Sequence, residues 1–290
     1  MDDREAGPNR ELEKAIMTAG DLPTIPVVAM KVMKLIESES ATAEELAKVV
    51  AADPAVAARV LKISNSSFYG CQRKIQTLSS AIVILGFSTL RSLVVAASVK
   101  QVYKPYGLTE KMLWEHSFAA GLAAKIIAHR THAVNEEEAF LAGLFHDIGK
   151  IIMNSLDRDK FQEVMQHCYN EGISFATAER AVYPFTHEEV GAYVMKKWNF
   201  PDMLTKAILH HHRLEFGPLD DQVLVNLSAV ASLADLFCLK LGIGVREPDE
   251  TIELAGSKAG ELLKLSEGEA EAMLETFHDA FETDRTFFVS

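Results

Sequence analysis

Helical periodicity runs through almost the whole chain: apolar residues recur every three or four positions, and hardly any stretch alternates between apolar and polar residues. The segment 42–52 shows the pattern, because a capping box of Thr42 and Glu45 precedes its apolar stripe. The segment 53–64 follows, with Asp53 in the N-cap position and a proline directly after it. The sequence therefore predicts an all-α protein.

The main internal boundary is predicted at the segment 104–107, where a proline and a glycine stop the preceding helix. We expect residues 13–105 to form an N-terminal helical bundle, with a turn-rich break at residues 65–70 and a division between two helices at Gly86. We expect residues 106–250 to form a second bundle of longer helices, on which the first packs. Residues 251–290 are acidic and amphipathic, and covering helices with a frayed tail are expected there.

The charge of the chain argues against nucleic acid as a partner. The formal net charge is -12 at pH 7, whereas phosphate binding needs a basic surface, and an anionic membrane surface is disfavoured for the same reason. A DNA-binding turn around Gly86 and Phe87 is an alternative. The helix after it carries Arg91 followed by valines and alanines, which favours packing over reading of a DNA groove.

Three observations favour a cytoplasmic location. No apolar stretch is expected to approach the roughly 18 to 20 residues of a membrane span. The charged segment 1–14 lacks the apolar core of a signal peptide. Cys71, Cys168 and Cys238 are scattered and form no CxxC pair, which is typical of reduced, mostly buried thiols.

The segment 143–150, with the sequence GLFHDIGK, places three polar groups in a run that otherwise looks buried. These are His146, Asp147 and Lys150, and we expect them within one continuous helix over residues 136–155. A charged carboxylate inside a protein is costly unless it is paired or bound to a metal. Asp147 is therefore expected to meet several hydrogen-bond donors or to bind a cation.

Four other helices also bring imidazole or carboxylate groups to apolar surfaces, and neutral imidazole and carboxylate are ligands favoured by zinc, iron and manganese. Two ions that share a bridging carboxylate can clamp phosphate oxygens and generate hydroxide. Asp147 is the expected bridge because its carboxylate has two oxygens, and Lys150 is placed to meet a phosphate. The groups on the other four helices are His116, His187, His211 with His212, and Asp235.

Each of these residues also has a simpler interpretation. His116 could be a partly exposed core histidine, His187 could bond a neighbouring carbonyl, and Asp235 could pair with Arg91. The histidine run that begins at residue 210 could be a solvated helix end. Considered together, with two carboxylates predicted to be buried, metal binding is the favoured hypothesis. The remaining histidines are assigned to the surface: His129, His132, His167 and His278.

Several stretches of the chain match a known family. They include DPAVAARVLKISNSSFYG, AGLFHDIGKIIM and the aspartate of ASLADLF, within a region of about residues 20–245. The second part resembles the HD superfamily of metal-dependent phosphohydrolases, and the first part resembles the HDOD family, the HD-related output domains of bacterial signalling proteins. The resemblance implies an N-terminal helical bundle joined to an HD-like bundle. It also implies that the family metal positions are His116, His146, Asp147, His187, His211 and Asp235.

Two functions follow from the resemblance. The first is a signal-transduction output module that acts through contacts with signalling proteins and holds one or two divalent ions (Fe, Mn, Zn, Ni or Mg). The alternative is a phosphohydrolase acting on a nucleotide or another phosphoester, with Asp147 and Lys150 as its catalytic residues. His212 matches the second histidine of the doublet in the related HD-GYP phosphodiesterases. The segment 210–220, HHHRLEFGPLD, lacks the Gly-Tyr-Pro pattern of those enzymes, which argues against cyclic di-GMP hydrolysis.

Overall fold

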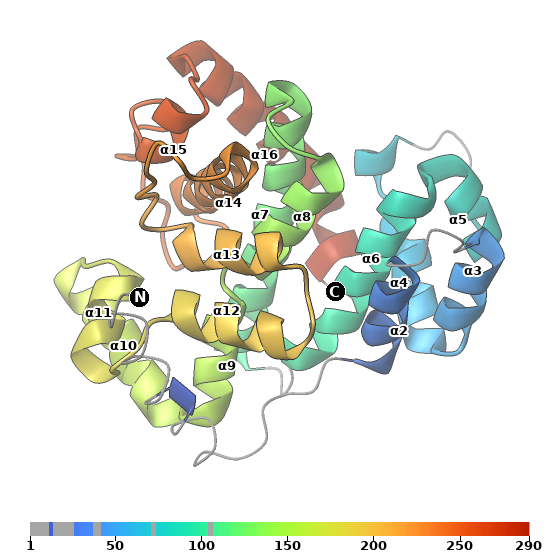
Figure 1. Cartoon of the computed structure of the whole chain (residues 1–290), viewed down its shortest axis with the longest axis horizontal. Helices are drawn as coiled ribbons and strands as arrows, with labels where there is room; N and C mark the ends of the chain where they lie inside the picture. The colour runs from blue at the N-terminus through green and yellow to red at the C-terminus, as the bar shows by residue number, and fades with distance from the viewer. Residues whose placement is uncertain (1–11, 14–25, 37–41, 71–73, 104–106, 290) are drawn as a thin grey trace.

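The computed structural model describes residues 12–13, 26–36, 42–70, 74–103 and 107–289. Every regular element in these ranges is a helix (Figure 1), so the predicted all-α fold is confirmed. The described helices before the predicted boundary are α2 (Val27–Ile36), α3 (Ala43–Ala51), α4 (Pro54–Ser64), η2 (Ser67–Tyr69), α5 (Leu78–Leu85), α6 (Phe87–Val99) and η3 (Lys100–Tyr103). Those after it are α7 (Leu108–Thr131), α8 (Glu136–Phe145), α9 (Ile148–Leu156), α10 (Arg158–Glu171), α11 (Phe175–Val182), α12 (His187–Lys197), α13 (Asp202–His210), α14 (Gln222–Leu241), α15 (Lys258–Leu262) and α16 (Glu267–Val289).

Several helices of the N-terminal part begin and end at the residues predicted from the sequence. Thr42 and Glu45 form the capping box of α3, and Asp53 accepts the first backbone N–H groups of α4. Gly86, with φ of +86°, separates α5 from α6 as predicted. The predicted boundary at residues 105 and 106 falls outside the described residues, as does Cys71.

The prediction of one continuous helix over residues 136–155 is wrong. Helix α8 ends at Phe145, α9 begins at Ile148, and His146 and Asp147 form a turn between them. In that turn the ring Nδ1 of His146 lies 2.6 Å from the carbonyl oxygen of Gly143, so the side chain satisfies a backbone group that the broken helix leaves free. The break lets both side chains of the turn face the same point, which a regular helix would not allow.

Glycines permit the close helix packing around this turn. A Cβ at Gly149 would overlap the backbone carbonyl of His187, so only glycine lets the start of α12 lie directly on α9. A Cβ at Gly143 would overlap the backbone carbonyl of Ala120 on α7 in the same way. Both glycines of the GLFHDIGK segment therefore bring neighbouring helices to the turn.

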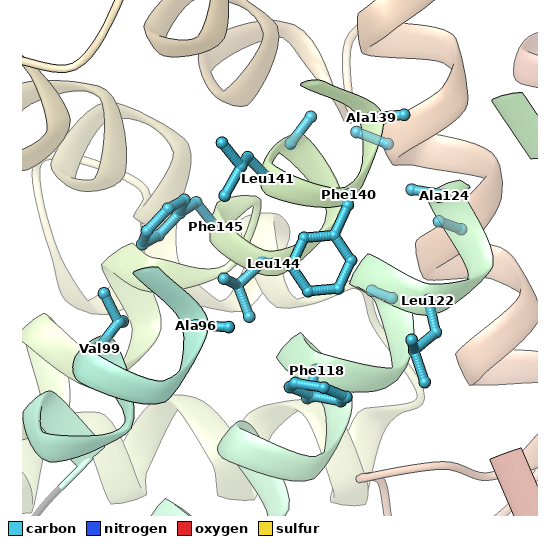
Figure 2. Close-up of a cluster of buried hydrophobic side chains, with 14 of the residues drawn as sticks. Ala96, Val99, Phe118, Leu122, Ala124, Ala139, Phe140, Leu141, Leu144 and Phe145 are labelled. Atoms are coloured by element: carbon cyan, nitrogen blue, oxygen red, sulfur yellow. The ribbon is translucent and has the colours of Figure 1, made fainter. Parts of the chain in front are cut away.

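The apolar core is continuous between the two parts of the chain. Figure 2 shows Ala96 and Val99 of α6 in one cluster with Phe118 of α7 and with Phe140 and Leu144 of α8. Burial of large apolar side chains is the dominant favourable term in folding, at roughly 25 cal/mol per Å². The N-terminal helices are therefore packed on the second bundle, as the predicted fold class states.

Helix α14 corrects one expectation from the sequence. Within the described residues it is the one helix that is long and apolar enough, by length and composition, to cross a membrane. The expectation that no apolar stretch approaches that length was wrong. In the structure 67% of its apolar window is buried inside the protein, which accounts for its composition. The cytoplasmic location remains a prediction.

Candidate metal centre

The seven residues predicted as metal ligands come together between α7, α9, α12, α13 and α14. His116 lies on α7 and Asp235 on α14, His187 begins α12, and the histidine doublet follows α13. Their ligand atoms form two groups that share Asp147, with the atoms of each group within 4.8 Å of one another. The first group is His116, His146, Asp147 and Asp235, and the second is Asp147, His187, His211 and His212.

The two oxygens of Asp147 face different groups. Its Oδ2 lies 3.5 Å from His116 Nε2 and 3.4 Å from His146 Nε2. Its Oδ1 lies 3.2 Å from His187 Nε2 and 4.0 Å from His211 Nε2. A single carboxylate therefore stands between two sets of imidazoles, which is the arrangement expected of a bridging ligand.

Asp235 completes the first group. Its Oδ1 lies 3.0 Å from His116 Nε2 and 3.7 Å from His146 Nε2. Its Oδ2 lies 3.9 Å from His212 Nδ1, so it also reaches toward the second group. The alternative pairing of Asp235 with Arg91 is thus not the one that the structure shows. Of the seven residues only His212 reaches solvent appreciably, with a side chain 28% exposed.

The outer nitrogens of the histidines fix the direction of the inner ones. Nδ1 of His116 lies 3.0 Å from the carbonyl of Ile243, and Nδ1 of His211 lies 2.6 Å from the carbonyl of Ile208. Because a carbonyl only accepts, Nδ1 carries the proton, and Nε2 of the neutral ring presents a lone pair to the centre. That lone pair meets carboxylate oxygens, which also only accept, so a proton or a cation is needed between them. Nε2 of His146 and of His211 have no hydrogen-bond partner among the described residues.

The segment after α14 supplies one of these carbonyls. Gly242 and Gly244 have φ of +72° and +69°, a conformation that favours glycine, and they turn the chain back onto α7. A Cβ at Gly244 would overlap His116 and the carbonyl of Met112. The two glycines therefore bring the carbonyl of Ile243 to His116.

The charges of the centre shift the pKa values of His146 and His211 in opposite directions. Burial lowers the pKa of His146, but the neighbouring Asp147 and Asp235 carboxylates outweigh it and raise that pKa to about 10. Burial, together with the charges of His146 and His187, lowers the pKa of His211 to about 3. Without an ion, the carboxylates favour the protonated form of His146. The positive charge of that ring and of His187 then disfavours protonation of His211. Divalent ions would replace these protons.

Lys150 lies beside the shared carboxylate of Asp147. Its Nζ donates to Asp147 Oδ2 at 2.6 Å and stands 4.5 Å from the centre of the Phe175 ring. Burial lowers the pKa of Lys150, but the charges of Asp147 and Asp235 outweigh it and raise that pKa. Lys150 is therefore a fixed cation at the edge of the centre.

Two buried glutamates near His187 were missed by sequence reasoning. Glu179 Oε2 lies 2.8 Å from His187 Nδ1, and Glu188 Oε2 lies 3.8 Å from the same nitrogen. Glu179 stands on α11, a helix that the sequence analysis did not anticipate. The available signal was Ser174, which caps α11 by accepting from the N–H of Thr177.

A cavity of about 960 Å³ opens onto the centre. His116, Asp147, Lys150, His212 and Asp235 all border it, so both groups of possible ligands are accessible from one side. Its other walls come from α7, α10, α11 and the segment after α14. Among the wall residues are the cations Arg180, Arg213 and Arg246 and the apolar side chains of Phe161, Met165 and Phe175.

The other histidines lie away from the centre. His129, His132 and His278 are exposed and His167 is half-buried, as the assignment to the surface predicts. The described cysteines are free: Cys238 is buried, as expected, and Cys168 is half-buried.

Comparison with known proteins agrees with this architecture. A family model described as HDOD domain matches residues 22–214. An HDOD domain protein of unknown function from Geobacter sulfurreducens has a similar structure, with a TM-score of 0.81 and 24% identity over 97% of this chain and 98% of that one. A candidate phosphohydrolase from Shewanella amazonensis SB2B gives a TM-score of 0.73 and 22% identity over 97% and 98% of the two chains. At these identities, the two structures show a shared fold alone.

A curated relative is longer than this chain. It is an uncharacterized protein of Treponema pallidum (strain Nichols), 22% identical over 218 residues, which is 75% of this chain. The chain spans 42% of the length of that relative.

Proposed function

The chain belongs to the HDOD family, and from that premise we propose that it is a metal-dependent phosphoesterase. One observation supports the proposal most directly: two groups of possible ligands share Asp147 and open together onto one cavity. A structural metal site is usually closed by protein ligands, whereas a catalytic site keeps a position open to substrate.

The ligand assignment follows the two groups. His116, His146 and Asp235 would hold one ion with Oδ2 of Asp147, and His187, His211 and His212 would hold a second with Oδ1. The orphaned Nε2 atoms of His146 and His211 are the sign that the set fits a cation. The mixture of imidazole and carboxylate suits iron, manganese, zinc or nickel better than magnesium.

Divalent ions bound there would polarise a phosphoryl oxygen and lower the pKa of water. The role of the chain is to orient and neutralise the substrate. Asp147 fixes the spacing between the two positions, while the buried ammonium of Lys150, facing the same cavity, offsets the charge of a phosphate. The arginines and apolar side chains of the walls suit a phosphoester that carries an apolar or aromatic group, such as a nucleotide.

The test is metal content together with hydrolysis. The full chain would be stripped with a chelator, reloaded separately with Mn²⁺, Fe²⁺, Zn²⁺ or Ni²⁺, and assayed with bis(p-nitrophenyl) phosphate and a panel of nucleotides. We expect two ions per chain and metal-dependent release of product, both lost in Asp147→Ala and both kept in Asp279→Ala, whose side chain is 88% exposed. Two tightly bound ions with no hydrolysis of any substrate would leave the metal centre standing and overturn the enzymatic proposal.

A second candidate function is favoured by the surface of the N-terminal bundle. Val83 and Ile84 on α5 are 84% and 51% exposed, on a helix at the outer side of that bundle (Figure 1). Contiguous exposed apolar surface marks contact sites for other proteins, and these two residues are neighbours in the sequence. We propose that this surface binds a signalling protein, as in an output module. Partner recovery by affinity capture with the parent chain, and its loss with Val83→Asp/Ile84→Asp but not with Asp147→Ala, would support this function. Equal recovery with all three chains would contradict it.

A further inference from the structure

Glu179 has a buried carboxylate whose hydrogen bonds both come from one histidine. It is fully buried on α11. Its Oε2 accepts from Nδ1 of His187 at 2.8 Å and from the backbone N–H of the same residue at 2.9 Å. Among the described residues, these are the hydrogen bonds that the carboxylate of Glu179 makes. An ionised carboxylate in a dry interior is costly, so a site that keeps one there depends on the charge of its partner.

This contact distinguishes the two sides of the candidate centre. In the first group, Nδ1 of His116 and Nδ1 of His146 both donate to neutral backbone carbonyls. In the second group, Nδ1 of His211 also meets a carbonyl, whereas Nδ1 of His187 meets a carboxylate. A carboxylate behind an imidazole makes the opposite ring nitrogen a stronger ligand and fixes the orientation of the ring. The inner nitrogen of His187 lies 3.2 Å from Asp147 Oδ1 and 3.1 Å from His212 Nε2.

We infer that Glu179 is a positioning residue that acts through His187 and gives the second metal position its affinity. The inference rests on the proposed function, because it presupposes an ion between Asp147, His187 and the histidine doublet. Glu179 does not border the cavity, so it acts without touching substrate. A carboxylate on α11, outside the sequence motifs, thus makes the two metal positions unequal.

A purely structural role for Glu179 has a different signature. Because Oε2 also accepts the first backbone N–H of α12, the carboxylate could serve only to cap that helix. Loss of a cap lowers the stability of the chain equally with and without metal. Loss of a group that strengthens His187 lowers the affinity of one ion and leaves the other unchanged.

The experiment measures the two ion affinities separately. Parent chain, Glu179→Gln and Glu179→Ala would be titrated with Co²⁺ against a competing chelator, with visible absorption reporting occupancy and elemental analysis reporting stoichiometry. Glutamine keeps an acceptor for the α12 N–H and removes only the charge. We expect the Kd of the second ion to rise about 10- to 100-fold in Glu179→Gln and at least as much in Glu179→Ala, with the Kd of the first ion unchanged.

A matched control comes from a second glutamate–histidine pair. His167 Nδ1 lies 2.6 Å from Glu171 Oε1 on the exposed side of α10, away from the centre. Glu171→Gln should leave both Kd values at those of the parent. Melting temperatures with and without Co²⁺ separate the capping role from the metal-binding role. If Glu179 strengthens metal binding, the difference in melting temperature between the parent chain and Glu179→Gln should grow when Co²⁺ is added.

The outcomes are distinct. A parent chain that binds no second ion would overturn both the proposed function and this inference. A parent chain that binds two ions, with Glu179→Gln and Glu179→Ala binding both at parental affinity, would overturn the role of Glu179 alone.

Discussion

One oxygen of Asp147 faces both the Lys150 ammonium and the candidate metal position. Its Oδ2 accepts from Lys150 at 2.6 Å, and the same oxygen faces Nε2 of His116 and His146. An ion held by those imidazoles would compete with the ammonium for that oxygen. Lys150 is therefore expected to weaken metal binding slightly while assisting a negatively charged substrate, and replacing it should separate the two effects.

Lys150→Met tests this separation. Methionine keeps most of the apolar stem but removes the charge, so the metal affinity should stay equal or rise. Because a cation aimed at developing phosphoryl charge is lost, kcat for phosphoester hydrolysis should fall about 100-fold. Lys160→Met, on α10, provides a control that should change neither quantity. Loss of metal together with activity in Lys150→Met would show that the lysine supports the ligands rather than the substrate.

Gly149 lies where an added side chain would overlap the backbone of the neighbouring helix. In Gly149→Ala the new Cβ would overlap the backbone carbonyl of His187, so α9 and α12 must separate. We expect the free energy of unfolding to fall by about 1–3 kcal/mol, the range for overpacking of a well-packed interior. Gly268→Ala, where the added Cβ meets nothing within 4 Å, should change it by less than about 1 kcal/mol. Urea denaturation of both variants is the measurement; equal effects would contradict the steric explanation.

Helix caps, and polar residues within apolar helices, are the features of this structure that local sequence can predict. The caps at Thr42 and Asp53 lie beside the helices they start, and Asp235 stands out because its own helix is apolar, so both kinds of signal are local. The convergence of the candidate ligand residues could be predicted for the same reason, since polar groups in apolar helices need partners.

Other features depend on contacts between distant segments. Glu179 looks like an ordinary polar residue in its sequence, because its burial arises only when α11 meets the start of α12. The break at His146 and Asp147 was missed because the residues around it keep helical spacing. The turn is stabilised by packing on α7 and α12 through Gly143 and Gly149 rather than by a proline or a glycine in the turn itself.

The contact between α6, α7 and α8 contains an ion pair of a buried glutamate with a half-buried lysine, and we expect this pair to give the stability of the fold a pH dependence. Glu137 Oε1 on α8 accepts from Lys125 Nζ on α7 at 2.6 Å and from the Thr89 hydroxyl on α6 at 2.8 Å. Burial raises the pKa of Glu137, but the charge of Lys125 and the hydrogen bonds outweigh it and hold that pKa below its usual 4.5. A depressed carboxylate pKa stabilises the fold above pH 4.5, and this contribution is lost as the pH falls through the folded-state value.

Glu137→Gln should remove that contribution. At pH 7 we expect the free energy of unfolding to fall by about 1–3 kcal/mol, because hydrogen bonds to a charged group are replaced by weaker ones. The difference between parent and variant should shrink as the pH is lowered below 4.5, since the parent then becomes protonated too. Glu138→Gln, at an exposed neighbouring position, should follow the parent at every pH. Chemical denaturation between pH 3 and pH 7 provides the comparison, and a gap that widens in acid would contradict the assignment.

Helix α16 contacts both the N-terminal bundle and helix α7. Asp284 on α16 accepts from the Ser67 hydroxyl at 2.7 Å and from the backbone N–H of Phe68 at 2.8 Å, within the turn that follows α4. The next residue, Arg285, pairs with Glu115 on α7, beside the candidate ligand His116. Helix α16 is thus more than the covering helix predicted from sequence, since it ties the N-terminal bundle to the helix that carries part of the metal centre (Figure 1).

These two contacts should differ greatly in their contribution to stability. Asp284 is 3% exposed, so Asp284→Ala leaves the half-buried N–H of Phe68 without its acceptor and should lower the free energy of unfolding by about 1–3 kcal/mol. Arg285 is 49% exposed, and an ion pair in water contributes at most about 1 kcal/mol, so Arg285→Ala should cost less. Denaturant titrations of both variants measure the two losses in the free energy of unfolding. The comparison shows whether the buried Asp284 or the exposed ion pair of Arg285 contributes more to the attachment of α16. If Arg285→Ala cost more than Asp284→Ala, the connection through α16 would depend on the ion pair to α7, and the contact with the turn after α4 would be secondary.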